Sequence, residues 1–349
     1  MKASYRKHIL NFKRPSGTSR GILKTKETFF LILNDGKSYG IGECGLLRGL
    51  SIDDRADYEE KLQWVCENIV LGEAEFYQAL TQFPSIQFGV ETAFKSLLSE
   101  DSFILFPSEF TQGEASISIN GLVWMGDEGF MKEQISEKLK QGFTCVKMKI
   151  GAIDFKTELA LLKSIRKQFS SSEVELRVDA NGAFSPKEAL EKLKVLSDLK
   201  LHSIEQPIRQ GQWQEMARLC EDSPLAIALD EELIGVFQKE EKSKLLHTIK
   251  PQYIILKPSL IGGFQGSDTW INLAERNGAG WWITSALESN VGLNAISQYT
   301  FTKNSKLPQG LGTGSLYTNN IESPLKVSNG TLKYDISEVW NLDLLHNNQ

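Results

Sequence analysis

Cys145-Val146-Lys147-Met148-Lys149-Ile150 sets the architecture expected for this chain. Apolar residues and lysines alternate in it with a period of two, which is the side-chain period of a β-strand. The apolar residues therefore share one face of the strand, and the two lysines share the other. Similar short runs recur downstream and end near Asp179, Glu205, Asp230, Lys257 and Ser285, and an earlier run ends near Asn120.

These strand ends recur at a regular interval. From Lys149 to Ser285, each end follows the previous one after 25 to 30 residues, which is the length that one strand, one helix and two short loops require. Such a period predicts repeated βα units around a parallel sheet. Residues 307–311 supply a weak eighth strand, so we expect an α/β fold, a TIM-type (β/α)7β barrel. An open doubly wound sheet is the alternative, but no Gly-x-Gly-x-x-Gly opens a helix after a first strand.

The pattern changes along the chain and divides it. At 349 residues the chain has room for about two domains. Residues 1–112 predict an α+β capping domain, because alternating runs flank the hairpin signal Asn34-Asp35-Gly36-Lys37 and helical patterns follow near 55–70 and 88–99. Residues 113–312 carry the barrel, the expected catalytic domain. Residues 313–349 lack the βα pattern, and we expect this tail to pack on the capping domain.

Composition argues against several classes of partner. Lys plus Arg (39) nearly balance Asp plus Glu (44), and the net charge of −5 is spread without long runs of one sign, which disfavours nucleic acid and anionic membranes as partners. No apolar stretch is typical of a signal peptide or a membrane span. The four cysteines form no CxxC pair, which favours a reduced, cytoplasmic compartment. We expect a small-molecule partner, and a homo-oligomer is compatible with this composition.

Three acidic residues are expected to meet inside the barrel. Asp179, Glu205 and Asp230 end three consecutive strands, at the end of a parallel barrel where active sites lie. Converging carboxylates repel one another, so we predict a divalent cation between them. An all-oxygen ligand set without Cys or His favours Mg²⁺, with Mn²⁺ as the alternative. Arg177 shares the inward face with Asp179 and is expected to contact these carboxylates.

Lysines flank the acids on the neighbouring strands. Lys147 and Lys149 precede them, and Lys257 follows them. Ammonium groups beside a divalent cation should have a lowered pKa, because the charged form is disfavoured, and such a lysine can act as a base near neutral pH. The pattern predicts abstraction of a proton next to a carboxylate, with the resulting charge stabilised by the metal and an opposite lysine.

Each of these features alone has an ordinary structural explanation. A Lys-x-Lys pair on a strand is commonly a solvated edge, and an Asp or Glu at a strand end commonly caps the next helix. A non-catalytic barrel that binds a carboxylate ligand is a further alternative. The catalytic interpretation depends on finding Lys, Asp, Glu, Asp and Lys on five successive strands.

That order of residues resembles the enolase superfamily and, within it, the muconate lactonizing group. The resemblance covers nearly the whole chain, and its segments include Val146-Lys147-Met148-Lys149, Arg177-Val178-Asp179-Ala180-Asn181-Gly182, Ile204-Glu205-Gln206-Pro207, Leu229-Asp230-Glu231 and Leu256-Lys257-Pro258. It implies that Asp179, Glu205 and Asp230 bind the metal. It also implies Lys149 as the general base, Lys257 as the lysine on the opposite face of the substrate and Lys147 as the lysine that orients and assists. Asn181 and Glu231 are expected to support these groups.

Later segments separate the subgroups. A mandelate-racemase-type enzyme carries a His at the seventh strand, where this chain has Ser285-Ala286-Leu287-Glu288-Ser289. Dipeptide epimerases carry Asp-x-Asp on the eighth strand, where this chain has Gly310-Leu311-Gly312. Together with Thr18-Ser19-Arg20-Gly21 and Gly42-Glu43-Cys44, these segments resemble the o-succinylbenzoate synthase family.

This resemblance implies a Mg²⁺-dependent lyase reaction of menaquinone biosynthesis. Water would be removed by syn elimination from 2-succinyl-6-hydroxy-2,4-cyclohexadiene-1-carboxylate to give 2-succinylbenzoate. Arg20 would bind the succinyl carboxylate, and the other implied substrate contacts are Ser285, Glu288, Ser289, Gly312 and Thr313. The alternatives are an N-succinylamino acid racemase, which would use Lys149 and Lys257 as two bases, and another enzyme of the group, such as a dipeptide epimerase or a cycloisomerase.

Overall fold

A computed structural model describes residues 1–18 and 21–342, so the expected Arg20 contact lies outside the described residues. The chain begins with an antiparallel sheet of order β1-β2-β3, formed by β1 (Lys2–Thr18), β2 (Gly21–Asn34) and β3 (Tyr39–Cys44). The predicted hairpin between β2 and β3 is confirmed. Asp35 Oδ1 closes its turn by accepting hydrogen bonds of 2.8 Å from the backbone N–H groups of Lys37 and Ser38.

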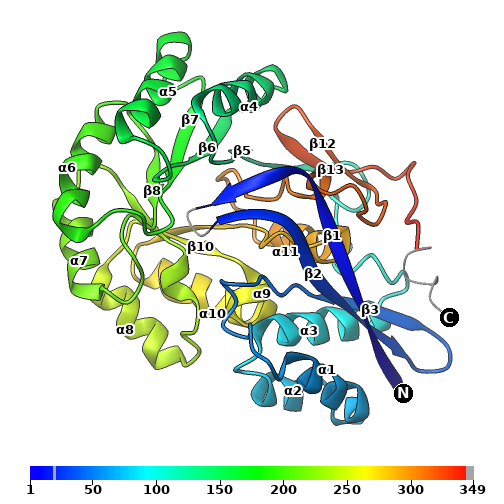
Figure 1. The fold of residues 1–349 in the computed structure, drawn as a ribbon. Helices are drawn as coiled ribbons and strands as arrows, with labels where there is room; N and C mark the ends of the chain where they lie inside the picture. Colours follow the sequence, from blue (N-terminus) through cyan, green and yellow to red (C-terminus); the bar gives the residue numbers. More distant parts are fainter. Residues whose placement is uncertain (19–20, 343–349) are drawn as a thin grey trace.

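Helices α1 (Tyr58–Glu67), α2 (Glu73–Ala79) and α3 (Pro84–Leu98), with the short 3₁₀ helix η1 (Ile69–Leu71), pack on one face of this sheet (Figure 1). The α3 backbone lies directly on β3 at two glycines. A Cβ atom on Gly40 would lie 2.2 Å from the carbonyl oxygen of Ala93, and one on Gly42 would lie 1.9 Å from that of Gly89. The Gly-x-Gly of β3 therefore permits the close approach that builds the capping domain.

The predicted parallel barrel follows. Seven parallel strands lie in the order β11-β10-β9-β8-β7-β6-β5, and they are β5 (Gly121–Val123), β6 (Cys145–Lys149), β7 (Glu175–Asp179), β8 (Ser203–Glu205), β9 (Ile227–Leu229), β10 (Tyr253–Leu256) and β11 (Gly280–Ile283). The helices outside them are α4 (Glu128–Lys140), α5 (Phe155–Gln168), α6 (Pro186–Ser197), α7 (Trp213–Asp222), α8 (Lys239–Ile249), α9 (Pro258–Ile261), α10 (Gly263–Arg276) and α11 (Asn290–Thr302), with the 3₁₀ helices η2 (Glu231–Leu233) and η3 (Gly314–Leu316).

Side-chain alternation along these strands is as predicted. Val146, Met148 and Ile150 are fully buried in the core between the sheet and the helices. This core also takes the apolar faces of β7 to β11, so the opposite faces of the strands are left to form the barrel interior. Within the described residues, no helix combines the length and apolarity needed to cross a membrane.

The barrel closes differently from a full eighth strand. Residues 307–311 bridge β11 to the start of the barrel through single parallel bridges, Ile119 to Gln309 and Thr284 to Gly310. The first barrel strand was expected to end near Asn120, but β5 begins after it. Residues 116–118 form β4 (Ser116–Ser118) and pair instead with the tail. An isolated short strand carries no signal for which partner it will choose.

The tail divides its contacts between the two parts of the molecule. Its hairpin, β12 (Leu325–Ser328) and β13 (Thr331–Tyr334), adds antiparallel to β4 beside the barrel. Tyr317 packs on Phe12 of the capping domain, with ring centroids 4.8 Å apart. We expected the tail to pack on the capping domain. It does so in part, but it also packs beside the barrel.

Candidate active site

Six charged side chains gather at the carboxyl ends of the strands β6 to β10. Lys149, Asp179 and Glu205 are level with one another, because the parallel register pairs Lys149 with Asp179 and Asp179 with Glu205. Lys147 lies two residues earlier on the same face, and Asp230 and Lys257 follow β9 and β10 directly. All six are buried, so each charge requires a partner.

Lysines and carboxylates supply these partners for each other. Asp179 Oδ2 lies 2.8 Å from Lys149 Nζ and 3.1 Å from Lys147 Nζ. Lys147 also pairs with Glu205, and Lys257 pairs with Asp230. The site is therefore a cluster of three carboxylates flanked by three ammonium groups at one mouth of the barrel.

The carboxylates suit a divalent cation, although among the described residues no three acidic, His or Cys side chains are grouped as a metal cluster. The ammonium of Lys147 lies between Asp179 and Glu205, so these two carboxylates can share one cation. Both oxygens of Glu205 are buried; Oε1 makes no hydrogen bond, and Oε2 contacts the ammonium of Lys147. An all-oxygen set with unused lone pairs is what Mg²⁺ or Mn²⁺ requires.

The neighbouring carboxylates by themselves raise the pKa of two of the lysines, and the lowered pKa beside a bound cation stays a prediction. Burial lowers the pKa of Lys147, but the attraction of Asp179, Glu205 and Asp230 outweighs it and raises that pKa. Asp230 and Glu205 raise the pKa of Lys257 against the same effect of burial. Burial and the neighbouring Asp179 raise the pKa of Glu205 well above its usual value. The carboxylates, as the nearest charges, therefore dominate both lysines.

Asn181 and Glu231 extend the hydrogen-bonded cluster around Lys149. Lys149 Nζ donates to Asn181 Oδ1 at 2.8 Å, and Asn181 Nδ2 donates to Glu231 Oε1 at 3.1 Å. Gln206, which sequence reasoning missed, holds the segment after β9: its Oε1 accepts from the backbone N–H of Asp230 at 3.1 Å. An amide after a strand-end acid was the available signal for this role.

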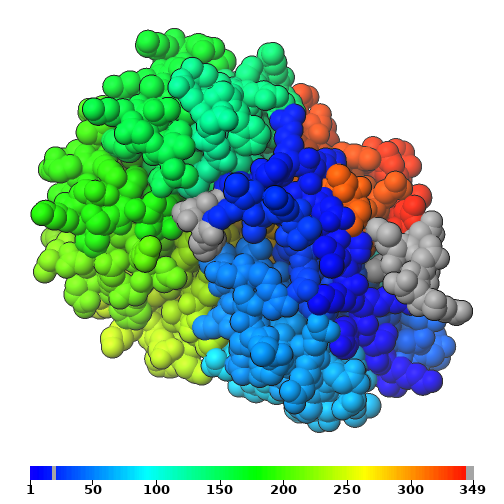
Figure 2. Space-filling view, in the orientation of Figure 1, coloured from blue at the N-terminus to red at the C-terminus, as the bar shows by residue number. Residues whose placement is uncertain are grey.

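A cavity of about 890 Å³ opens above these groups. Lys147, Lys149, Asp179 and Lys257 line it, and the capping domain adds apolar side chains, among them Leu23 and Leu47. The capping strands lie across the barrel face in the space-filling view (Figure 2), and Gly17 of β1 forms a bridge to Met125 after β5. Both domains therefore contribute to the lining of this cavity.

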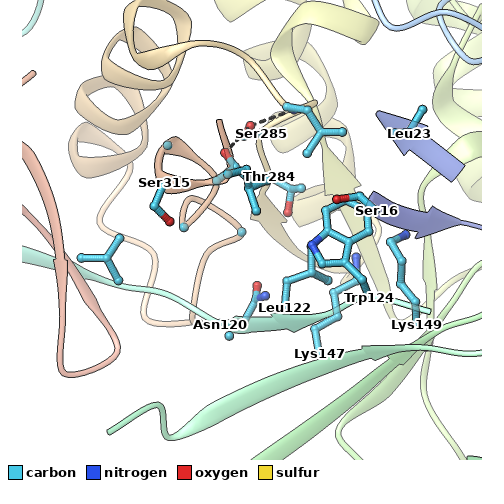
Figure 3. Close-up of a pocket in the computed structure, with 18 of the residues that line it drawn as sticks. Ser16, Leu23, Asn120, Leu122, Trp124, Lys147, Lys149, Thr284, Ser285 and Ser315 are labelled. Atoms are coloured by element: carbon cyan, nitrogen blue, oxygen red, sulfur yellow. Dashed lines mark hydrogen bonds between the residues drawn. The ribbon is translucent and has the colours of Figure 1, made fainter. Parts of the chain in front are cut away.

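Three of the implied substrate contacts lie on the wall of this cavity: Ser285, Gly312 and Thr313. Ser285 Oγ accepts hydrogen bonds from Thr313 Oγ1 at 2.8 Å and from the backbone N–H of Leu287 at 2.9 Å (Figure 3). Because both lone pairs of Ser285 are used, its hydroxyl hydrogen remains to be donated into the cavity.

Glu288 and Ser289 are not among the residues that line this cavity, and their contact with the substrate stays a prediction. The backbone N–H of Ser289 donates to Glu43 Oε1 at 2.8 Å, and its hydroxyl donates to the same carboxylate. Glu288 accepts from the hydroxyl of Ser259. Leu287, with φ of 65°, turns the chain so that these residues face the junction with the capping domain.

Arg177 also differs from its expected role. Its Nε donates to Glu175 Oε1 at 2.7 Å and its Nη1 to the carbonyl oxygen of Pro308 at 2.9 Å, instead of reaching the carboxylates above. Its guanidinium lies 4.2 Å from the centre of the Trp282 ring. Arg177 lies two residues before Asp179 on the same strand face and is therefore one layer deeper in the barrel. There its side chain supports the closing segment through Pro308.

Trp124 is a wall residue that sequence reasoning missed. It lines the cavity directly after β5, and Lys149 Nζ lies 5.9 Å from the centre of its ring. Leu122, on the same face of β5, also lines the cavity. The sequence prediction ended the first barrel strand near Asn120, before β5 begins. The alternation of residues 122 and 124 was therefore not recognised, although it points both side chains inward.

Known proteins are similar to this chain in sequence. Residues 131–335 match the family described as enolase C-terminal domain-like. An o-succinylbenzoate synthase from Desulfotalea psychrophila is 49% identical over 95% of this chain and 98% of its own length. The L-Ala-D/L-Glu epimerase of Bacillus subtilis is 30% identical over 47% of this chain and 44% of its own.

Solved structures agree with the sequence comparison. The crystal structure of MenC from Desulfotalea psychrophila matches with a TM-score of 0.85 at 46% identity, over 95% of this chain and 99% of that chain. A substrate-liganded complex of the Bacillus subtilis epimerase matches with a TM-score of 0.82 at 21% identity, over 96% of each chain, and shows the shared fold alone. The chain belongs to the o-succinylbenzoate synthase family of the enolase superfamily, a family of hydro-lyases.

Proposed function

We propose that this chain removes water from 2-succinyl-6-hydroxy-2,4-cyclohexadiene-1-carboxylate to give 2-succinylbenzoate, with Lys149 as the base and acid. The observation that carries the proposal is the meeting of Lys149, Lys257 and three buried carboxylates under one capped cavity. The product is aromatic, which supplies the driving force. The protein therefore contributes mainly placement and charge stabilisation.

Lys149 moves the proton in both halves of the reaction. As a neutral amine it takes the hydrogen from the ring carbon that bears the carboxylate, and the electron pair of that bond forms the new double bond. The C–O bond to the hydroxyl on the same face breaks, and the ammonium of Lys149 returns its proton so that water leaves. One residue serving both steps accounts for syn geometry.

Lys257 acts from the other side of the substrate. It follows β10, while Lys149 ends β6, so the two amines approach from different parts of the strand ring. Its ammonium, held by Asp230, stabilises the negative charge on the substrate carboxylate, and Lys147 adds a second positive charge below. When bound by Asp179, Glu205 and Asp230, Mg²⁺ or Mn²⁺ would supply further stabilisation of the same charge.

Turnover of the cyclohexadiene by purified protein, followed through the absorbance of the aromatic product, tests this function. We expect activity with Mg²⁺, loss of activity with EDTA, and a fall of about 10³-fold in kcat for Lys149→Ala. Lys156→Ala, at an exposed position on α5, is the matched control and should behave as the wild type. Full activity of Lys149→Ala would contradict the proposal.

The racemase alternative has a distinct readout. A racemase needs two bases, so it would exchange deuterium from solvent into N-succinylamino acids at a rate that rivals dehydration. We expect dehydration to be much faster.

We also infer a reduced, cytoplasmic compartment, because Cys44, Cys66, Cys145 and Cys220 are all free thiols.

A further inference from the structure

The cavity has a second half that the proposed mechanism does not use. Charged groups occupy one side, around Lys149 and Lys257. The other side comes from the start of the barrel and its closing segment, and it includes the uncharged residues Asn120, Ser285, Gly312 and Thr313. In Figure 3, Asn120 and Ser315 lie on the side of the cavity away from Lys149.

Asn120 is unusual among these residues because one of its side-chain atoms, Oδ1, is buried without a hydrogen bond. The residue as a whole is 6% exposed. Its backbone is fixed, since the N–H of Asn120 donates to the carbonyl oxygen of Gln309 at 2.9 Å. An unsatisfied buried polar group costs about 1–3 kcal/mol. A ligand that offers the amide a hydrogen-bond partner would remove this cost.

Gly312 of the closing segment lies close to the backbone of Asn120. A Cβ atom on Gly312 would lie 3.3 Å from Ile119 Cδ1 and 3.8 Å from the carbonyl oxygen of Asn120, so a larger residue there would project over Asn120. The closing segment also forms the Ile119 to Gln309 bridge, in which the backbone N–H of Gln309 donates to the carbonyl oxygen of Ser118 at 2.8 Å. The closing segment and the residues before β5 therefore pack against each other at this point.

We propose that Asn120 is a specificity-determining residue that donates a hydrogen bond to an oxygen of the substrate's acyl chain, an inference that rests on the proposed function. The ring carboxylate must face the lysines, so the chain on the adjacent ring carbon extends toward the side of the cavity that Asn120 and Ser285 line. Keto and carboxylate oxygens there require donors. The amide of Asn120 can turn its NH₂ group toward them, and the free hydroxyl hydrogen of Ser285 provides a second donor.

Binding of two ligands distinguishes this role from a structural one. We measure, with Mg²⁺ present, the dissociation constants of 2-succinylbenzoate and of benzoate, which lacks the chain. Asn120→Ala should weaken 2-succinylbenzoate about tenfold and leave benzoate unchanged. Asn120→Asp should weaken it further, because a carboxylate repels the chain's own carboxylate. Asn272→Ala, at an exposed position on α10, is the control.

An equal loss for both ligands, or no loss for either, would overturn the inference. Asn120→Ser replaces the alanine variant if thermal unfolding shows that the latter is not folded. In turnover, the alanine variant should raise KM more than it lowers kcat. Because product binding needs no chemistry, its selectivity reports on Asn120 independently of Lys149. Wild-type protein that binds 2-succinylbenzoate but does not turn over the cyclohexadiene would instead contradict the proposed function.

Discussion

Lys149 Nζ donates a hydrogen bond of 2.8 Å to Asn181 Oδ1, which ties the proposed base to the loop after β7. Asn181 adopts φ of 43°, a left-handed conformation that Asn and Gly tolerate better than other residues. Its own NH₂ group is held by Glu231. The amine of Lys149 is therefore oriented from two sides, by Asp179 and by Asn181.

Asn181→Gly should slow turnover without unfolding the protein. Glycine accepts the positive φ, so the variant removes the hydrogen bond to Lys149 and adds no backbone strain. We expect kcat to fall by about tenfold or more through misplacement of the amine, with a smaller change in KM. Asn304→Gly, at φ of 54° in an exposed loop, is the matched control. Unchanged kcat in Asn181→Gly would show that Asp179 alone orients Lys149.

Mg²⁺ should stabilise the wild-type protein and not Glu205→Gln. A ligand that binds only the folded state at a hundredfold excess over its Kd adds about 2.7 kcal/mol to the free energy of unfolding. Replacing one oxygen of Glu205 by an NH₂ group removes a ligand atom and a charge. Thermal unfolding with and without Mg²⁺ measures the difference, with Glu191→Gln on the exposed face of α6 as control. The same Mg²⁺ shift in Glu205→Gln would exclude Glu205 as a ligand.

Glu43→Gln should loosen the capping domain. The Glu43 carboxylate accepts hydrogen bonds from the hydroxyls of Thr28 and Ser289 and from the backbone N–H groups of Ser289 and Gly292. A glutamine would direct its own NH₂ group at some of these donors, so we expect a loss of about 2–4 kcal/mol in the free energy of unfolding and a raised KM. Urea denaturation measures the first, and Glu114→Gln at an exposed position is the control. An unchanged midpoint of urea denaturation in Glu43→Gln would show that these hydrogen bonds do not hold the capping domain.

Glu91 should make stability fall as the pH rises. Burial raises the pKa of Glu91 to about 8, above its value in the unfolded chain, so the folded state binds the proton more tightly. Its contribution to stability is complete below the unfolded pKa and is lost as the pH rises through about 8. The slope it adds is at most about 1.4 kcal/mol per pH unit.

Chemical denaturation at several pH values between 5 and 8 measures this slope. Glu91→Gln should flatten it, while Glu109→Gln, at an exposed position, should not. Glu91 accepts hydrogen bonds from the backbone N–H groups of Phe264 and Gln265 at the start of α10, so the effect acts where the capping domain meets the barrel. A slope that persists in Glu91→Gln would assign it to other groups.

Local periodicity was enough to predict the charged site. Alternation within β6 and β7 decides which face of a strand each lysine and carboxylate takes, and the interval of 25 to 30 residues decides that the strands are parallel neighbours. Side chains at equivalent strand ends must then meet, as Lys149, Asp179 and Glu205 do. This part of the protein follows from short-range pattern alone.

Contacts between distant segments depended on the tertiary structure. The turn at Leu287 sends Glu288 and Ser289 to the domain junction, β4 pairs with the tail, and Arg177 stacks on Trp282 one layer below the site. Trp124 and Asn120 line the cavity beside the closing segment, which comes from a distant part of the chain and bridges to Ile119 at Gln309. A sequence pattern specifies the face a residue takes, whereas its partner depends on how segments hundreds of residues apart pack together.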